Sequence, residues 1–502
     1  MNSANTSKKT TPWHAMLLNG IYKYGVFVVI FFAFATRLPQ LLSENLFLDG
    51  DECIVGLMAK HFAEGKAIPW FFYGQSYGFS MVEVFSIRLF YAVFGVNDIA
   101  VKLAMLTLWI VGVLFFHKTL KHFETERNKW APLLITLAFV CMPSLAIWSM
   151  KARGGYLTAF LLTSIVIYII STKPLTKHPF LALLVGLMIV FIYQSQPLWL
   201  AGLLPIIGYF TFINVRLKTV ALQLLGILMG VMFFSVIKSG LSQFCSPSVV
   251  SFTNFNAETL RSIPSFVFGH LTGSYIYSQL IPSAISTRLA AFFYTVLLFA
   301  TFLVLGARWF KKSSIHPLSF ILALSVIANL GYLMLLGEGN YRYLLPLSGY
   351  IFLMFFFVYG RSMHQRWVNL TTCLLIVIGS IALYYFKNVS DVAQSSILAM
   401  KETLYAEKVH YVFCQSGLIQ WQLDFYSNEE IIARYNTRVD RYPEYIQRVN
   451  KAFFEPNTDT GVIGHADSEL ADESEEVITI DYNYFLYKNP SRSILEKRGF
   501  EF

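Results

Sequence analysis

The feature that most constrains this chain is a series of apolar runs that are long enough to cross a lipid bilayer. A membrane helix needs about 20 consecutive apolar residues, and this 502-residue sequence has about eleven such runs. Only 14% of its residues are charged, against about a quarter in soluble proteins. The sequence therefore predicts an all-α multi-pass membrane bundle, with spans centred near residues 21–42, 98–116, 130–148, 155–172, 179–192, 198–213, 219–237, 289–307, 316–336, 343–360 and 367–386.

Lys and Arg indicate the orientation of the bundle, because they are enriched in short cytoplasmic loops. With a cytoplasmic N-terminus, the inside segments hold 15 Lys and Arg in 58 residues and the outside segments hold 9 in 123. Residues 1–20 are polar and are followed by no clear cleavage site, so we interpret the first run as a retained span. The inside segments are then 1–20, 117–129, 173–178, 214–218, 308–315 and 361–366, and the outside segments are 43–97, 149–154, 193–197, 238–288 and 337–342.

Charge divides the chain into two predicted domains. Residues 1–386 hold 27 basic and 11 acidic residues, whereas residues 387–502 hold 12 basic and 19 acidic ones. An odd number of spans places the acidic domain outside the cytoplasm, with the long loops 43–97 and 238–288, so the chemistry is expected in that compartment. Strand-like and helix-like stretches alternate in the acidic domain and predict a small α/β fold: 410–414, 417–426, 430–435, 442–454, 461–464 and 477–487.

No glycine-rich nucleotide fingerprint follows the first predicted strand of the acidic domain, where Cys414-Gln-Ser-Gly417 stands. We therefore interpret residues 387–502 as an accessory domain without catalysis of its own.

Three carboxylates open the first outside loop: Asp49, Asp51 and Glu52. Transfer of a group to a hydroxyl needs a base near the acceptor, and a carboxylate in a partly dry site can have a pKa suited to that work. The alternative is a solvated acidic turn, in which Asp51 is the N-cap of a helix that begins near Cys53. Both interpretations stay open on the sequence alone.

The rest of this loop predicts contact with the membrane surface. Residues 52–64 have an apolar face and are predicted to form an amphipathic helix lying on the membrane. Residues 69–77 are rich in aromatic side chains and include Gln75 and Tyr77. Such a stretch serves either as a belt at the lipid headgroups or as a surface on which a sugar stacks.

Two arginines occur in short outside turns between apolar spans. Arg153 lies in the segment 151–156, and Arg342 follows Tyr341 in the segment 337–343. A cation at the end of a span often only reaches toward headgroups. The planar guanidinium also binds phosphate through two parallel hydrogen bonds, and a phosphate leaving group needs its growing charge stabilised. Arg153, Arg342 and Tyr341 are therefore candidate substrate-binding residues.

Taken together, these segments resemble the GT-C superfamily of membrane glycosyltransferases, in particular bacterial relatives of the protein O-mannosyltransferases and the lipid A aminoarabinose transferase. The family pattern of an Asp-Glu pair after the first span, a Gly, an aromatic stretch and a later Phe-Gly is matched by Asp51-Glu52, Gly65, Trp70 to Tyr73 and Phe94-Gly95. Further similar segments are Ala152-Arg-Gly-Gly-Tyr156, Arg342-Tyr-Leu-Leu-Pro346 and Trp421-Gln-Leu-Asp-Phe-Tyr-Ser427.

This resemblance implies a GT-C-like bundle in which Asp51 is the catalytic base and Glu52 its supporting neighbour. It also implies a polyprenyl-phosphate-linked sugar as donor and, for most members, inversion of the anomeric centre. The sequence departs from better-known relatives at two places. Gly74-Gln-Ser-Tyr-Gly78 stands where a Lys/His-Pro-Pro-Leu motif is found, and Gly154-Gly155 stands where an Asp follows the arginine.

The predicted function is that of a glycosyltransferase that uses a hydroxyl of a glycan, lipid or protein as acceptor. We expect a multi-pass protein of the bacterial inner membrane that contacts membrane lipids and no nucleic acid. The sequence has no metal-binding motif and identifies no cofactor, and it leaves a divalent metal open. The alternatives are a polytopic transporter, although the acids gather in loops rather than in mid-membrane, and a membrane enzyme that adds a phosphate-linked group to an envelope lipid.

Overall fold

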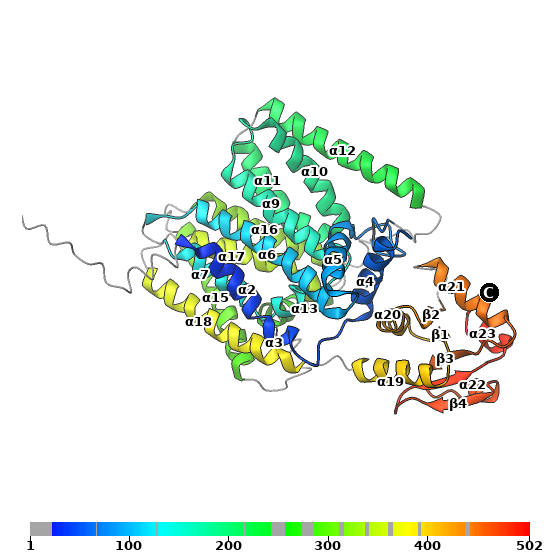
Figure 1. Cartoon of the computed structure of the whole chain (residues 1–502). Coiled ribbons are helices and arrows are strands. Elements are labelled where there is room, and N and C mark those ends of the chain that lie inside the picture. The colour runs from blue at the N-terminus through cyan, green and yellow to red at the C-terminus, as the bar shows by residue number, and fades with distance from the viewer. Residues whose placement is uncertain are drawn as a thin grey trace, which may run out of the picture.

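A computed structural model describes most of the chain (Figure 1). The described residues are 23–66, 68–126, 129–213, 216–241, 257–273, 285–310, 316–336, 341–359, 365–389, 393–436 and 442–502. Residues 1–22, about half of the loop 238–288 and parts of the segments 117–129, 214–218, 308–315, 337–342 and 361–366 lie outside these ranges.

The predicted spans correspond one by one to helices of the structure. Among the described residues, five segments are long and apolar enough to cross a membrane, and six more apolar helices are shorter. α10, α11 and α16 each begin at a proline, whose missing N–H is not needed in the first turn of a helix. The helices are α2 (Gly25–Ala35), α6 (Asp98–His122), α7 (Ala131–Val140), α9 (Tyr156–Thr172), α10 (Pro179–Ser195), α11 (Pro197–Ile213), α12 (Leu217–Leu241), α15 (Ile285–Phe310), α16 (Pro317–Leu336), α17 (Leu345–Tyr359) and α18 (Gln365–Tyr385). The chain is therefore an integral membrane protein with an all-α membrane domain.

Short helices lie beside these spans. The predicted span at 130–148 is interrupted, because α7 ends at Val140 and a separate turn, α8 (Leu145–Trp148), follows Pro143. A proline cannot donate to the preceding turn, so it breaks the helix there. The other short elements are α3 (Leu38–Leu41), α4 (Gly50–Ala63) and α5 (Met81–Phe94) in or before the first long loop, α13 (Ala257–Thr272) in the second, and the 3₁₀ turns η2 (Tyr341–Leu344) and η3 (Phe386–Asn388).

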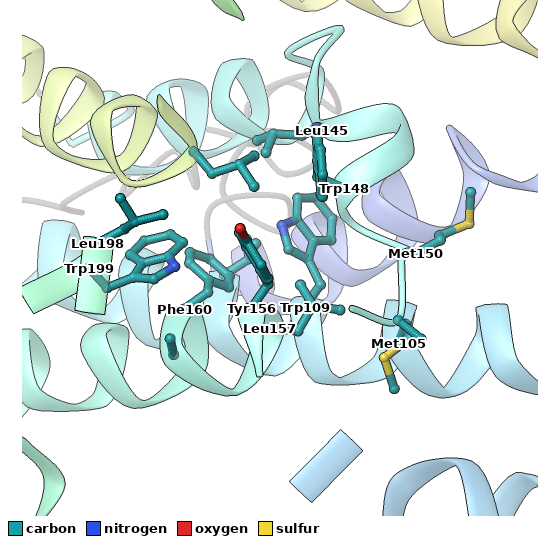
Figure 2. Packing of buried hydrophobic residues seen from close by; sticks show 14 of the residues in the cluster. Met105, Trp109, Leu145, Trp148, Met150, Tyr156, Leu157, Phe160, Leu198 and Trp199 are labelled. Atoms are coloured by element: carbon teal, nitrogen blue, oxygen red, sulfur yellow. The ribbon is translucent and has the colours of Figure 1, made fainter. Parts of the chain in front are cut away.

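An aromatic cluster fills the bundle beneath the segment between α8 and α9 (Figure 2). The rings of Trp148 and Tyr156 stack with centroids 5.9 Å apart, and those of Phe160 and Trp199 lie 5.4 Å apart. Trp109 of α6 is 2% exposed and belongs to the same cluster. Such rings bury large areas and hold fixed geometries, so this cluster is a rigid base for the loop that follows α8.

The acidic domain is an α/β fold, as its sequence predicts. Its five-stranded sheet has the order β2-β1-β3-β5-β4, in which β1 pairs in parallel with β2 and β3. Val412 and Cys414 of β1 pack on one face of the sheet, and Phe413 packs on Phe453 and Phe500 on the other. The elements are α19 (Ala393–Ala406), β1 (Tyr411–Cys414), α20 (Gly417–Tyr426), β2 (Ile432–Tyr435), α21 (Pro443–Phe454), β3 (Thr460–Gly464), α22 (Ser468–Asp472), β4 (Glu476–Thr479), β5 (Phe485–Lys488) and α23 (Arg492–Lys497).

One element of this domain differs from the prediction. The stretch 477–487 is not a single strand, because β4 and β5 pair with each other as an antiparallel hairpin. The turn between them contains Asp481, whose carboxylate accepts hydrogen bonds from the N–H groups of Asn483 and Tyr484. Asp favours turns through such local hydrogen bonds. Asp481 therefore marks the turn that separates the stretch into two strands.

Candidate functional site

The acidic turn formed by Asp49, Asp51 and Glu52 is the beginning of helix α4. Asp49, not Asp51, is the N-cap: its Oδ1 accepts a hydrogen bond from the N–H of Glu52 at 3.0 Å, and Glu52 Oε2 accepts one from the N–H of Asp49 at 3.2 Å. This reciprocal pair is a capping box. The helix therefore begins at Gly50, and the prediction that Asp51 caps a helix from Cys53 is wrong. Asp51 is left available for another role.

Each carboxylate of this turn is held by a basic side chain from another part of the fold. Asp49 Oδ2 lies 2.5 Å from Lys151 Nζ, and Asp51 Oδ2 lies 2.5 Å from the Nη2 of Arg153. The Nη1 of Arg153 also lies 3.8 Å from Asp49 Oδ2. The structure thus brings Asp49, Asp51 and Arg153 together, although about a hundred residues separate the two loops.

Glu52 forms a buried ion pair that the sequence analysis did not identify. Its Oε1 lies 2.6 Å from Lys102 Nζ, and both side chains are less than a tenth exposed. Breaking such a pair on one side leaves an uncompensated buried charge, which destabilises a protein by about 3–5 kcal/mol. The sequence signal for this pair is Lys102, which lies in the first turns of a predicted span, because charged residues in spans are rare and have partners.

The charges of this cluster shift the pKa values of its members. Burial alone would raise the pKa of Asp49, but Lys151 and Arg153 outweigh it and lower the pKa to about 2. Burial raises the pKa of Glu52, and Lys102 opposes that effect. Asp49 is therefore a fixed anion whose partners hold it, so it is a poor proton acceptor.

Arg153 and Lys151 are positioned by a loop that lies against two other segments. A Cβ on residue 155 would lie 2.8 Å from the carbonyl oxygen of Ser195 and 2.9 Å from that of Phe79, and Gly155 has a φ of +90°. Only glycine fits such a close approach with a positive φ. Glycine is therefore required at residue 155 because the carbonyl oxygen of Phe79, in the loop 69–80, lies directly beside it.

Arg37, at the end of the first span, binds the segment that leads into the same loop. Its buried guanidinium donates to the Ser149 hydroxyl at 3.1 Å and to the carbonyl oxygens of Val140 and Leu145 at 2.8 and 3.2 Å. Val140 is the last residue of α7, so Arg37 binds a carbonyl that the end of this helix leaves open, and its bond to Leu145 ties it to the first residue of α8. The sequence signal is a lone arginine directly after an apolar run.

Glu83 of α5 anchors the other end of this loop. Its Oε1 accepts hydrogen bonds from the N–H groups of Leu157 and Thr158, at 3.0 and 3.3 Å, in the first turn of α9. Burial raises the pKa of Glu83 to about 7, although these backbone N–H groups oppose the shift. The side chain is fully buried, so it stabilises the start of α9 and the position of Arg153.

We expect Glu83→Gln to flatten the dependence of stability on pH. The folded-state pKa of about 7 lies above the ordinary value of about 4.3, so the folded state binds the proton more tightly. The stability present below about pH 4 is therefore lost as pH rises to 7, by an amount on the order of 3 kcal/mol. Melting temperatures of the detergent-solubilised protein at pH 5 and pH 8 measure this loss.

The difference between the two melting temperatures should shrink in Glu83→Gln, because the amide still accepts from Leu157 and Thr158 but does not titrate. Glu402→Gln, on the exposed side of α19, is the matched control and should behave as the wild type. An unchanged pH dependence in Glu83→Gln would show that another group is responsible.

The other predicted substrate-binding residues lie on neighbouring segments. Tyr156 of α9 is within electrostatic range of Arg153, Arg342 and Tyr77, and Arg342 is within range of Asp51. Arg342 donates from its Nη2 to the Tyr343 hydroxyl at 3.2 Å. The basic groups Arg153 and Arg342 therefore share one region with Asp51.

Tyr341 and Gln75 lie in different surroundings: Tyr341 packs against α13, and Gln75 lies in a turn of the loop 69–80. The Tyr341 ring packs edge-on against Phe266 of α13, with centroids 5.1 Å apart. Gln75 lies in a tight turn, where its N–H donates to the carbonyl oxygen of Phe72 at 3.0 Å. Tyr77 is 37% exposed. Tyr341 thus links the site region to α13.

Helix α4 does not lie on a membrane surface with one apolar face. Most of its residues are buried, including Lys60 and His61, because it packs between α5 and α20 of the C-terminal domain (Figure 1). Lys60 Nζ lies 2.5 Å from Glu429 Oε2, and His61 Nε2 lies 3.0 Å from Glu429 Oε1. The prediction of an interfacial amphipathic helix is therefore wrong: the polar side of the helix faces the C-terminal domain.

A cleft of about 410 Å³ opens where α4 meets the C-terminal domain. Asp51 and Ile54 line it from α4, and Gln415, Ser416, Trp421 and Tyr435 are among the residues that line it from the other side. Small-molecule sites typically have about 300–1,000 Å³. The cleft thus places the exposed part of the Asp51 carboxylate at the wall of a ligand-sized space.

Metal-ligating side chains are not grouped in this region. In the part of the chain that the structure describes, no three His, Cys, Asp or Glu side chains are arranged to hold a metal ion. The carboxylates of the acidic turn are instead paired with Lys151, Arg153 and Lys102.

Comparison with known proteins identifies similar structures but no similar sequences. No family model matches the chain, and no curated protein matches it. The structure is similar to ArnT from Cupriavidus metallidurans in the apo state, with a TM-score of 0.60 and 12% identity, over 94% of this chain and 98% of that one.

ArnT from the same organism bound to undecaprenyl phosphate gives a TM-score of 0.61 and 11% identity over the same shares of the two chains. An Archaeoglobus fulgidus oligosaccharyltransferase in the apo form gives a TM-score of 0.47 and 10% identity, over 90% of this chain and 70% of that one. At such identities the similarity to ArnT shows the fold. The chain is therefore an integral membrane protein with a GT-C-like fold.

Proposed function

We propose that this protein transfers a sugar from a polyprenyl-phosphate donor to a hydroxyl acceptor on the extracytoplasmic face of the bacterial inner membrane. The fold is that of ArnT, and one of the two ArnT structures contains undecaprenyl phosphate. The observation that carries the proposal is the position of Asp51, whose carboxylate lies at the wall of a cleft and beside Arg153.

Asp51 is the proposed general base. It removes the proton from the acceptor hydroxyl while the acceptor oxygen forms a bond to the anomeric carbon of the donor. The bond from that carbon to the phosphate oxygen breaks, and the polyprenyl phosphate leaves with the electron pair. A displacement of this kind inverts the anomeric centre, and a positioned base typically contributes about 10²–10⁴ in rate.

Arg342 is the proposed ligand of the donor phosphate, with Arg153 as its neighbour. Arg153 already pairs with Asp51 and Asp49, whereas Arg342 donates to a neutral phenol. A donor phosphate that attracts Arg153 also weakens its hold on Asp51, which makes the carboxylate a stronger base. Asp49 acts as a fixed anion that keeps Lys151 and Arg153 in place, and Glu52 holds Lys102.

The proposed orientation places this cluster and the C-terminal domain outside the cytoplasm. We expect a reporter fused after Phe502 to be active outside, and one inserted within residues 308–315 to be active inside, because of the distribution of Lys and Arg. Paired alkaline phosphatase and fluorescent protein fusions measure this. A cytoplasmic C-terminus would refute both the count of spans and the shared compartment.

Mass spectrometry of envelope glycans, lipids and proteins from a deletion strain tests the function. The proposal predicts that a hexose, pentose or aminosugar is missing from one class of molecule and returns with the wild-type gene, but not with Asp51→Asn. Loss of a phosphate-linked group instead would identify the protein as the alternative lipid-modifying enzyme. An unchanged envelope together with an accumulated or excluded solute would indicate a transporter.

A further inference from the structure

The cleft beside Asp51 is formed by two parts of the chain that the sequence places far apart. Its lining comes from the first turns of α4 and from the C-terminal domain, whose residues supply most of it. The C-terminal domain therefore contributes to the space in front of the proposed base and is not only an accessory.

The position of the cleft in the sheet favours ligand binding. β1 lies between β2 and β3 in the parallel part of the sheet. Ligands of open α/β sheets bind outside the carboxyl ends of the strands. The cleft lies at this edge of the sheet, where it is lined by Gln415 and Ser416, which directly follow β1, and by Tyr435 at the end of β2.

The junction of the two parts is packed closely enough to fix this geometry. A Cβ on residue 50 would lie only 2.9 Å from Leu418 Cδ2 and 3.0 Å from its Cα, so the first turns of α4 and α20 touch. The Leu48 N–H donates to the Tyr426 hydroxyl at 2.7 Å, and Gln422 Nε2 donates to the Leu48 carbonyl at 3.1 Å.

A cluster of buried polar side chains continues the contact between α4 and the C-terminal domain. Glu429 accepts hydrogen bonds from the Tyr445 hydroxyl at 3.0 Å and from His61 Nε2 at 3.0 Å, and it pairs with Lys60. The hydroxyl of Tyr73 lies 2.8 Å from His61 Nδ1. Because these groups are buried and have partners, the C-terminal domain is held in one position relative to Asp51.

The lining chemistry fits a neutral molecule rich in hydroxyls. Gln415, Ser416 and Gln420 offer neutral donors and acceptors, and Trp421 and Tyr435 offer aromatic rings. Asp51 supplies a carboxylate whose charge is paired with Arg153, and none of the ten lining residues carries a positive charge. A phosphate would therefore find no cation among the lining residues to bind it, whereas sugar rings combine hydroxyls with apolar faces that pack on aromatic rings.

We propose that this cleft is the acceptor subsite and that it binds a neutral sugar ring, with the attacking hydroxyl at Asp51. The acceptor is then a glycan or a glycosylated lipid rather than a protein hydroxyl or a phosphate. This inference rests on the proposed function, because it assigns the second substrate of the same site.

The test uses the full-length protein in lipid vesicles, with radiolabelled donor and acceptor supplied by an extract of the deletion strain's envelope. Gln415→Met and Tyr435→Phe keep side-chain volume and remove polar atoms from the cleft. Each should raise the KM for acceptor about three- to tenfold, as expected for one lost hydrogen bond, while the KM for donor stays unchanged. The controls are Gln447→Met on the exposed side of α21 and Tyr411→Phe at the opposite end of the parallel strands, which should change neither KM.

Mass spectrometry of the product locates the added sugar and separates the outcomes. A new sugar–sugar linkage, with raised acceptor KM in the cleft variants, supports the inference, and its position on a lipid or a free glycan distinguishes the two sources. A sugar added to a Ser or Thr side chain, or to a phosphate, would overturn it. Transfer by the wild type with equal acceptor KM in cleft and control variants would also overturn it but leave the proposed function intact, whereas absence of transfer by the wild type would refute the proposed function itself.

Discussion

Asp51→Asn is expected to lower sugar transfer by a factor of about 10²–10⁴ without unfolding the protein. An amide keeps the size of the side chain but cannot accept the proton of the acceptor hydroxyl. Folding should survive because the N-cap of α4 is Asp49, and the capping box with Glu52 does not involve Asp51. Transfer rates and melting temperatures of the purified variant measure the two effects separately.

Asp49→Asn is the matched comparison. Asn is also a good N-cap, so the helix should persist, and the loss of the ion pair with Lys151 should lower activity far less than Asp51→Asn does. If Asp49→Asn is inactive while Asp51→Asn is active, the base has been assigned to the wrong carboxylate. If both are active, the acidic turn has a structural role only.

Arg342→Ala is expected to lower transfer by about 10²–10³, as is typical when a group that stabilises charge in the transition state is removed. The guanidinium lies within electrostatic range of Asp51 and is proposed to hold the donor phosphate. Arg342→Lys keeps the charge and loses the planar fork, so its activity should lie between those of the wild type and Arg342→Ala. The KM for donor and the maximal rate in vesicles measure both variants.

Arg88→Ala is the control for this prediction. Arg88 lies in α5, and its guanidinium lies over the ring of Phe62 at 5.0 Å, but it has no proposed contact with donor. It should retain activity within a few-fold of the wild type. Wild-type turnover in Arg342→Ala at normal protein level would exclude Arg342 as the phosphate ligand.

The membrane domain could be predicted from the sequence because each span leaves a local signal. About 20 apolar residues are needed at each crossing, and all eleven predicted runs are helices in the structure. The alternation of strands and helices after residue 410 is equally local. The short interruptions were missed: at Thr36 and Arg37 in the first span, at Pro143 in the third span and at Asp481 between β4 and β5.

The details of the site depend on contacts between distant segments, which periodicity does not reveal. The partners of Asp49, Asp51 and Glu52 lie about 50 to 100 residues away, so the three carboxylates could not be ranked from sequence. The register of the cap was wrong by two residues because Asp49 and Asp51 are both good N-caps, and the contact of Gly50 with Leu418 cannot be read from either segment.

Helix α4 shows why an amphipathic pattern did not identify its surroundings. Its apolar residues predict one buried face correctly, but Lys60 and His61 are buried too, because Glu429 of the C-terminal domain pairs with them. A polar face that meets a complementary partner has the same sequence pattern as one that meets water.

The most direct test of the account is transfer by the purified full-length protein in lipid vesicles. These vesicles contain a radiolabelled polyprenyl-phosphate sugar and an envelope extract from the deletion strain. The account predicts that label moves from the donor into acceptor at a rate proportional to the amount of wild-type protein. It also predicts that Asp51→Asn, at a normal melting temperature, has a rate at least a hundredfold lower, because about 10² is the smallest loss expected when a general base is removed. Transfer by Asp51→Asn at the wild-type rate would contradict the account.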